Sequence, residues 1–215
     1  MFDRDQIRMV LAIFVVAVLA AAIVGLTDIV TREPIAEAEK QALHKALVQV
    51  LPKHQNDPQA DLLSVDGVTL YPAKDRLGHV HGFAWEVVAS DGYSGSIRIL
   101  VGLRPNGEIH AIRITKHLET PGLGDGIVHN SDWLQSFVGR MLEGSRWKVK
   151  KDGGDFDQFT GATITPRAVV KAVKGALEFY KVHQASIFDA VNQQNAISPQ
   201  QKVSQDEIKL ETKID

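Results

Sequence analysis

The feature that most constrains this chain is an apolar run near its start, Met9–Leu26, which contains no charged residue. A helix needs roughly 20 apolar residues to cross the hydrocarbon core of a bilayer, and this run with its edges is long enough. Buried helices of soluble proteins rarely stay apolar on every face over such a length. The sequence therefore predicts one membrane-spanning helix over residues 9–30.

The charges around the run indicate its orientation. Arg4 and Arg8 precede it and favour a cytoplasmic N-terminus over residues 1–8, although neighbouring aspartates weaken that bias. A cleaved signal peptide is the alternative, because Ala20–Ala22 resembles a small-residue cleavage site. The apolar run continues to Leu26, which favours an uncleaved anchor. Either interpretation puts the rest of the chain outside the cytoplasm.

Composition removes several classes of function. The 215 residues include no cysteine, which excludes disulfides, thiolate zinc sites, cysteine-ligated iron–sulfur clusters and haem attached through CxxCH. The formal net charge is -2 and the chain has no lysine or arginine block, so a nucleic-acid partner is not expected.

Residues 31–190 have the pattern of one α+β domain. A helical stripe begins at Pro34 and ends before Pro52, and a polar loop follows over residues 56–66. Four extended segments then suggest neighbouring antiparallel strands, with Asn106–Gly107 as the turn between the last two. These segments are 67–73, 78–90, 93–103 and 107–116. We expect a twisted antiparallel sheet packed by helices.

Two helices are predicted after the strands. One runs over residues 131–142 and is capped by Ser131, and the other is amphipathic and begins at Pro166 with Thr165 as its N-cap. The last 25 residues, 191–215, are rich in polar side chains and are predicted to be a disordered or transiently helical tail.

The start of the second helix carries an unusual run, "DQFTGATITP", over residues 157–166. Thr163 comes just before the helix, where free N–H groups and the positive end of the dipole favour an anion. Gly161 permits a conformation that a side chain would forbid. These residues alone leave two interpretations open: a phosphate site without lysine, or a capped helix with turn-forming threonines.

The same run resembles a known modification motif, D-x-x-[ST]-G-A-T, at which a flavin transferase attaches FMN to the last threonine through a phosphodiester. Thr163 matches that threonine and Asp157 matches the leading acid. Thr160 occupies a position that is often serine, followed by Gly161 and Ala162. The resemblance implies a phosphoprotein with a covalent flavin on Thr163.

A second match supports the first. The segments "GYSGSIRILVGL" and "GEIHAIRITKHLETPGLGD" resemble the FMN-binding domain of the G subunit of Rnf (Rsx) ion-translocating electron transport complexes. The related C subunit of the sodium-translocating NADH:quinone reductase shares much of this pattern and is an alternative. The resemblance implies that Glu119, Thr120, Leu123 and Gly124 line a flavin pocket opposite Thr163.

The resemblance also implies a role. The chain would be a redox relay subunit in the bacterial inner membrane, with its main domain in the periplasm and without stand-alone activity. Its partners would be other membrane subunits of the complex and the flavin transferase. A covalent cofactor also explains why no G-x-G-x-x-G dinucleotide loop is needed. Two functions of other classes remain as alternatives: a cofactor-free anchored scaffold, and a free-standing extracytoplasmic flavin reductase.

The remaining candidate residues give weaker signals. His79 and His81 alternate on a strand, a spacing seen in some metal sites, but without an adjacent third ligand they favour a solvated face, and no metal site is predicted. His117 beside the "ETPGLG" loop would either tune a flavin or hydrogen-bond the loop. No serine lies in a nucleophile-elbow pattern, so a hydrolase has no support.

Overall fold

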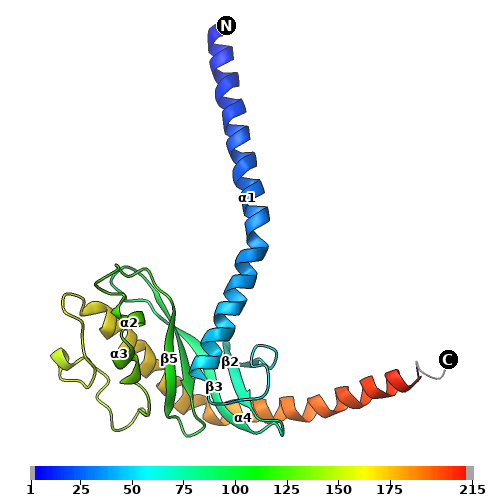
Figure 1. Ribbon diagram of the computed structural model, residues 1–215, viewed down its shortest axis with the longest axis vertical. Helices are drawn as coiled ribbons and strands as arrows, with labels where there is room; N and C mark the ends of the chain where they lie inside the picture. The colour runs from blue at the N-terminus through cyan, green and yellow to red at the C-terminus, as the bar shows by residue number, and fades with distance from the viewer. Residues whose placement is uncertain (1–2, 212–215) are drawn as a thin grey trace. The chain divides into compact units, whose positions relative to one another are not determined.

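The computed structural model describes the backbone of residues 3–211 and the side chains of residues 3–196 (Figure 1). It divides the chain into two units, Met1–His44 and Lys45–Asp215. Residues 1–2 of the predicted cytoplasmic segment and residues 212–215 of the predicted tail lie outside the described residues.

The first unit consists of helix α1, Arg4–Val50, whose last residues belong to the second unit. By length and composition α1 is able to cross a membrane, and its most apolar window has no buried side chain. The prediction of a new helix at Pro34 differs from the structure, because Pro34 lies inside α1. Proline removes only one backbone donor there, and the helix-forming residues on both sides continue the helix across that gap.

The second unit is built on a five-stranded antiparallel sheet in the order β1-β2-β3-β4-β5, which confirms the predicted α+β class. The sheet is an open meander in which each strand pairs with its neighbour in sequence. Its strands are β1 Leu63–Val65, β2 Val68–Lys74, β3 Val80–Ala89, β4 Ile97–Leu103 and β5 Ile109–Lys116.

Strand β1 falls in a segment predicted as loop. It pairs with β2 through a two-residue turn at Asp66 and Gly67, whose φ angles are 49° and 75°. Asp-Gly is a strong signal for such a turn, because both central residues need a positive φ. The Asn106–Gly107 turn between β4 and β5 is confirmed, and there Arg104 N donates to Glu108 O over 2.8 Å.

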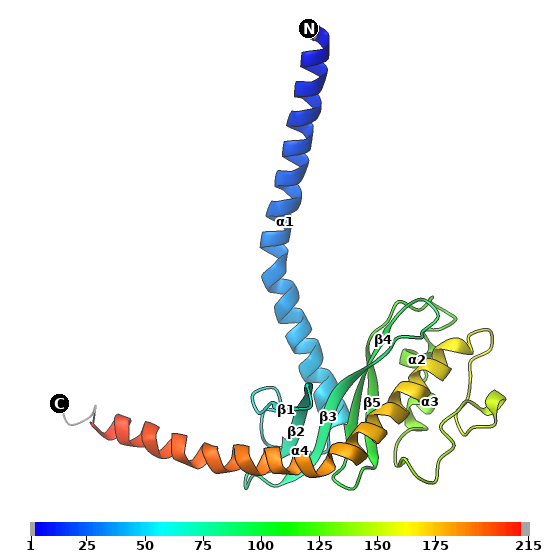
Figure 2. The same ribbon diagram turned by 180° about the vertical axis from the view of Figure 1, so that it is seen from behind.

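Helix α4, Ile164–Glu211, covers one face of the sheet (Figure 2). Its buried side chains pack with the strand residues Ile97, Ile99, Val101 and Leu103 in the main hydrophobic core. The opposite face is covered too: Leu100 is fully buried, and a Cβ on Gly102 would collide with the Val50 carbonyl. Glycine at this position lets the end of α1 approach the sheet.

Two short helices, α2 Gly126–His129 and α3 Ser131–Gln135, lie beside β5, and a 3₁₀ turn spans Lys150–Asp152. The predicted helix over residues 131–142 is therefore shorter than expected. Its cap is Asn130, whose side chain accepts from Trp133 N, and not Ser131. Gly139, with a φ of 78°, lies in the turns that replace the second half.

The end of the domain also differs from the prediction. Helix α4 continues through residue 190 to Glu211, and Val191 is buried. Lys74 is 5% exposed, and its ammonium donates to Gln194 Oε1 over 2.7 Å and to Asn195 Oδ1 over 3.1 Å. These polar residues belong to the folded unit because they supply acceptors that a buried ammonium requires.

Candidate functional site

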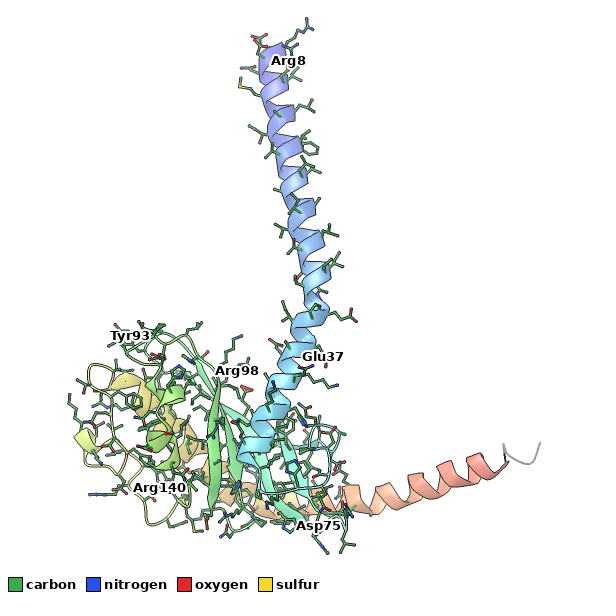
Figure 3. The ribbon with its side chains drawn as sticks, viewed as in Figure 1. Arg8, Glu37, Asp75, Tyr93, Arg98 and Arg140 are labelled. Carbon is green, nitrogen blue, oxygen red and sulfur yellow. The ribbon has the colours of Figure 1, made fainter. Side chains whose placement is uncertain are left out.

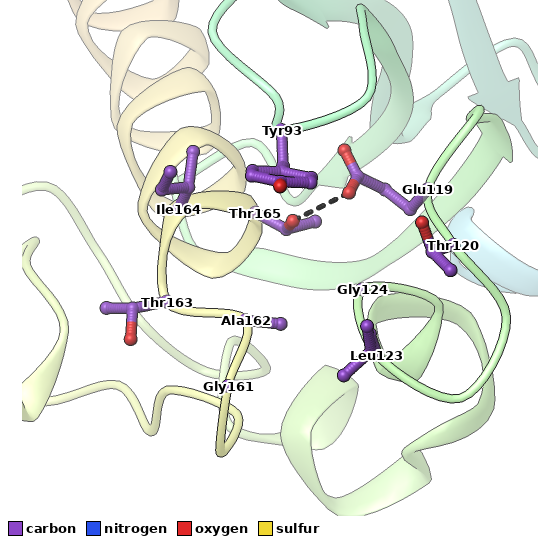
Figure 4. A pocket seen from close by; sticks show the side chains of 10 residues that line it. All are labelled: Tyr93, Glu119, Thr120, Leu123, Gly124, Gly161, Ala162, Thr163, Ile164 and Thr165. Carbon is purple, nitrogen blue, oxygen red and sulfur yellow. Dashed lines mark hydrogen bonds between the residues drawn. The ribbon is translucent and has the colours of Figure 1, made fainter.

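Three segments that are distant in sequence meet around one cavity of about 140 Å³ (Figure 4). The first is the loop between β3 and β4, the second is the loop that follows β5, and the third is the start of α4. The lining residues are Tyr93, Glu119, Thr120, Leu123, Gly124, Gly161, Ala162, Thr163, Ile164 and Thr165.

Glu119 joins these segments and is 4% exposed. Its Oε2 accepts a 2.9 Å hydrogen bond from Thr165 Oγ1 at the start of α4. Its Oε1 accepts from the backbone N of Ser94 in the β3–β4 loop over 3.2 Å. A buried carboxylate is costly unless such donors compensate it, so these bonds fix the three segments in place.

Glycine makes room for this carboxylate. A Cβ on Gly124 would lie 2.6 Å from Glu119 Oε2, and a Cβ on Gly92 would lie 3.0 Å from Oε1. The backbone of Gly124 therefore approaches Glu119 more closely than any other residue type allows, whereas at Gly92 the main obstacle to a Cβ is the Gly95 carbonyl oxygen at 2.2 Å. Gly124 of the matched segment "HLETPGLGD" thus has a packing role in the wall of the cavity.

His117 fixes the same loop from the other side. Its Nδ1 accepts a 3.2 Å hydrogen bond from the backbone N of Glu119. A ring nitrogen that accepts carries no proton, so the imidazole proton in this arrangement is on Nε2. Of the two roles predicted for His117, the hydrogen bond to the loop is the one observed.

The turn before α4 explains the glycine of the threonine-rich run. Ala162 N donates to Phe159 O over 3.1 Å, and Gly161 has a φ of 79°. A positive φ at the third position is typical of a type II turn and favours glycine. The turn brings Gly161, Ala162 and Thr163 into the wall of the cavity.

The prediction that Thr165 caps the helix is wrong. Helix α4 begins at Ile164, and its first backbone bond runs from Arg167 N to Thr163 O over 3.3 Å. The Thr165 hydroxyl donates to Glu119 instead of capping. Thr163 is therefore the residue directly before the helix, and the N–H groups of Ile164 and Thr165 have no acceptor within the helix. The Thr163 hydroxyl points to the opposite side of the chain from Ala162 and Leu123 (Figure 4).

Two of the predicted site residues lie outside this lining. Thr160 is exposed in the turn. Asp157 pairs with Lys150 across 2.7 Å, and its carbonyl accepts from Trp133 Nε1 over 2.8 Å. Three lining residues were not predicted as site residues: Tyr93, Ile164 and Thr165. Tyr93 is 71% exposed near the tip of the β3–β4 loop (Figure 3), and its place in the matched segment "GYSGS" was the available signal.

Positive and negative side chains are paired beside the start of α4. Arg167 binds Asp152 in a bidentate arrangement, with both N···O distances at 2.6 Å. The hydrogen bond from Arg167 lowers the pKa of Asp152, and the same bond raises the pKa of Arg167. An anion at Thr163 would therefore depend mainly on backbone N–H groups, because the guanidinium of Arg167 already has a carboxylate partner.

His79, directly before β3, and His81, within it, have an acidic neighbour that sequence spacing did not indicate. His79 Nδ1 lies 3.1 Å and His81 Nε2 lies 3.4 Å from Asp75 Oδ2. Among the side chains of residues 3–196 no group of three histidine or acidic residues has an arrangement suited to a metal ion.

Comparisons with known proteins agree with the resemblance seen in the sequence. Residues 92–178 match the model of the FMN-binding domain. A relative from Aliivibrio fischeri strain MJ11, named as the G subunit of an ion-translocating oxidoreductase complex, is 44% identical over 194 residues, covering 83% of this chain and 91% of the relative. A relative of the same name from Vibrio cholerae serotype O1 is 41% identical over 197 residues, covering 86% and 93%.

A solved structure is also similar. The crystal structure of Shewanella oneidensis NqrC aligns with a TM-score of 0.44 at 22% identity, covering 60% of this chain and 61% of that one.

Proposed function

Since this chain belongs to the G-subunit family of ion-translocating oxidoreductase complexes, we propose that it relays electrons through an FMN attached covalently to Thr163. The family makes the chain a redox subunit with an FMN-binding domain. The attachment, the roles of individual residues and the orientation in the membrane are the finer parts of the proposal.

One observation carries the proposal. The two sequence segments that resemble the flavin proteins are about 40 residues apart, yet Glu119, Thr120, Leu123 and Gly124 line the same cavity as Gly161, Ala162 and Thr163. A capped helix with turn-forming threonines would not need a cavity there. Convergence of both segments on one cavity supports a shared ligand.

The residues of the cavity fit FMN by their chemistry. Tyr93, Leu123 and Ile164 are exposed apolar side chains suited to the faces of a flat ring, and the exposed hydroxyl of Thr120 is suited to its polar edge. The first turn of α4 suits a phosphate, because its unbonded N–H groups and the dipole favour an anion. The cavity of about 140 Å³ is below the roughly 300 Å³ typical of enclosed ligand sites, so only part of FMN would enter it.

The proposed attachment is an ester between Thr163 Oγ1 and the phosphate of FMN, and it adds FMN less one water. In the net reaction a bond forms between Thr163 Oγ1 and phosphorus, and a P–OH bond of the phosphate breaks. The departing hydroxyl takes up the proton of the threonine hydroxyl and leaves as water. An ester removes the binding equilibrium, so the cofactor could not be lost by dilution outside the cytoplasm.

A bound flavin would supply one- or two-electron transfer. The chain's own residues would hold its phosphate at the start of α4, seat its ring and fix the wall through Glu119. Since the chain has no cysteine for an iron–sulfur centre, the electrons would come from one partner subunit and leave to another. We place α1 in the bacterial inner membrane and the second unit in the periplasm, with the flavin transferase as a partner in maturation.

The proposal is tested by co-expression with a flavin transferase, followed by denaturing gel electrophoresis and in-gel flavin fluorescence. Thr163→Ala is expected to abolish the fluorescent band, while Thr163→Ser keeps a hydroxyl and a reduced band. Thr160→Ala is the matched control and is expected to stay fluorescent. A fluorescent Thr163→Ala protein would contradict the attachment site, and a colourless wild type that still assembles with its partners would favour the scaffold alternative.

A further inference from the structure

A second cavity, of about 490 Å³, lies between β5 and the helices α2 and α3, and it opens to solvent. These elements lie side by side in Figure 1. It shares no residue with the cavity around Thr163. Its lining residues are Gln49, Arg104, His110, Ala111, Arg113, Val128, His129, Ser131, Leu134, Gln135 and Val138.

The lining contains two arginines and no carboxylate. Arg104 is already compensated, because its guanidinium pairs with Glu108. Arg113 is not: Nε donates to Gln49 Oε1 and Nη1 to Ile112 O, both over 2.8 Å, and these acceptors are neutral. Among residues 3–196 no acidic side chain forms an ion pair with Arg113. The cavity therefore contains one half-buried cation whose charge is uncompensated.

The histidines do not add a second fixed charge. Burial, followed by the positive charge of Arg104, lowers the pKa of His110, so this ring is neutral at pH 7. Its Nδ1 lies 3.4 Å from Arg104 Nη2. His129 is exposed and lies 3.9 Å from Asp125, which compensates it when it is protonated. One uncompensated guanidinium suits one carboxylate, whereas a doubly charged phosphate would need a second cation.

The rest of the lining suits the side chain of a protein. Gln135 and Ser131 add neutral polar groups, and Val128, Leu134 and Val138 provide an apolar wall for an aliphatic stem. The wide opening and mixed lining are less typical of an enclosed small-molecule site than of a protein interface, where arginine is enriched.

We propose that this cavity receives an aspartate or glutamate side chain of a neighbouring subunit, which pairs with Arg113. The inference rests on the proposed function in one respect: it assumes that the partner is another subunit of the same oxidoreductase complex. It assigns a contact surface distinct from the flavin site, so that docking and flavin attachment are separable.

The test is zero-length cross-linking in the purified, intact complex. Arg113→Lys places a primary amine in the cavity, and a carbodiimide then joins that amine to an adjacent carboxylate with loss of one water. Peptide mass spectrometry is expected to find the amine introduced at position 113 joined to an Asp or Glu of another subunit. Gln135→Lys is a second variant, which leaves Arg113 intact, and Arg98→Lys is the control because Arg98 pairs with Glu86 of its own chain.

A cross-link from either cavity variant only to peptides of this chain would overturn the proposal, as would the absence of any cross-link from both. Arg113→Gln is expected to weaken retention of this subunit in the complex about tenfold, with its flavin content unchanged. Unchanged retention would also overturn the docking proposal. Loss of flavin from the wild type, with cross-links intact, would count against the proposed function alone.

Discussion

Thr165 Oγ1 donates a 2.9 Å hydrogen bond to Glu119 Oε2, and both residues are almost completely buried. The bond joins the first turn of α4 to the loop after β5 across 46 residues of sequence. It connects two walls of the candidate flavin site without involving the flavin itself.

Removal of this link is expected to destabilise the domain. Thr165→Val keeps the shape of the side chain but leaves Glu119 without one of its two donors, and a buried group left unsatisfied costs about 1–3 kcal/mol. Chemical denaturation of the flavin-free protein measures the loss. Thr69→Val, at an exposed strand position, is the control and is expected to stay within about 0.5 kcal/mol of the wild type. Equal stabilities for the two variants would show that the bond contributes nothing.

Two glycine-to-alanine substitutions are expected to change the free energy of unfolding in opposite directions. Gly124→Ala places a Cβ 2.6 Å from Glu119 Oε2 and 2.9 Å from Glu119 Cβ, so the free energy of unfolding is expected to fall by about 1–3 kcal/mol. Gly175→Ala lies in α4 with nothing within 4 Å, and a better helix former there is expected to add up to about 1 kcal/mol. Thermal unfolding of both variants checks the pair. A Gly124→Ala protein as stable as Gly175→Ala would contradict the packing described around Glu119.

Asp75 is expected to make stability depend on acid pH. Desolvation raises its pKa, but hydrogen bonds from the backbone of His79 and Leu77 and from both histidine rings outweigh this and lower it from 3.8 to about 2. Stability from a carboxyl with a lowered pKa is present above the unfolded value of 3.8 and is lost as pH falls toward 2. Asp75→Asn is expected to lose less stability than the wild type between pH 4 and pH 2 (about the interval between the two pKa values).

The control for Asp75 is Asp189→Asn, at an exposed position of α4. Denaturation midpoints of the three proteins, taken across that pH range, give the comparison. If the denaturation midpoints of Asp75→Asn and of the wild type fall equally with pH, the Asp75 carboxylate is not the source of the pH dependence.

Sequence patterns predicted the sheet because its signals are local. Four extended segments, with Asn106–Gly107 as the turn between the last two, predicted four of the five strands. Strand β1 was missed although Asp66–Gly67 has the same turn chemistry, because β1 is only three residues long. The short strand carries too little periodicity to be recognised.

Most residues that line the cavity were named from the sequence, whereas the hydrogen bonds between them were not. Resemblance brought together Glu119 and Thr163, and both line the cavity. The hydroxyl of Thr165 was assigned to a helix cap, because nothing local shows that a carboxylate 46 residues away would accept from it. Tyr93 was missed for the same reason, since its contribution depends on where the β3–β4 loop folds. Long-range contacts of this kind are outside the reach of periodicity and capping rules.

The central claim is the covalent flavin on Thr163, and intact mass with peptide mapping tests it most directly. The full chain is expressed with a flavin transferase of demonstrated activity on a control substrate. We expect the mass of FMN less one water to be added, and the modified peptide to contain Thr163. An unmodified mass, or the added mass on a peptide without Thr163, would contradict the account.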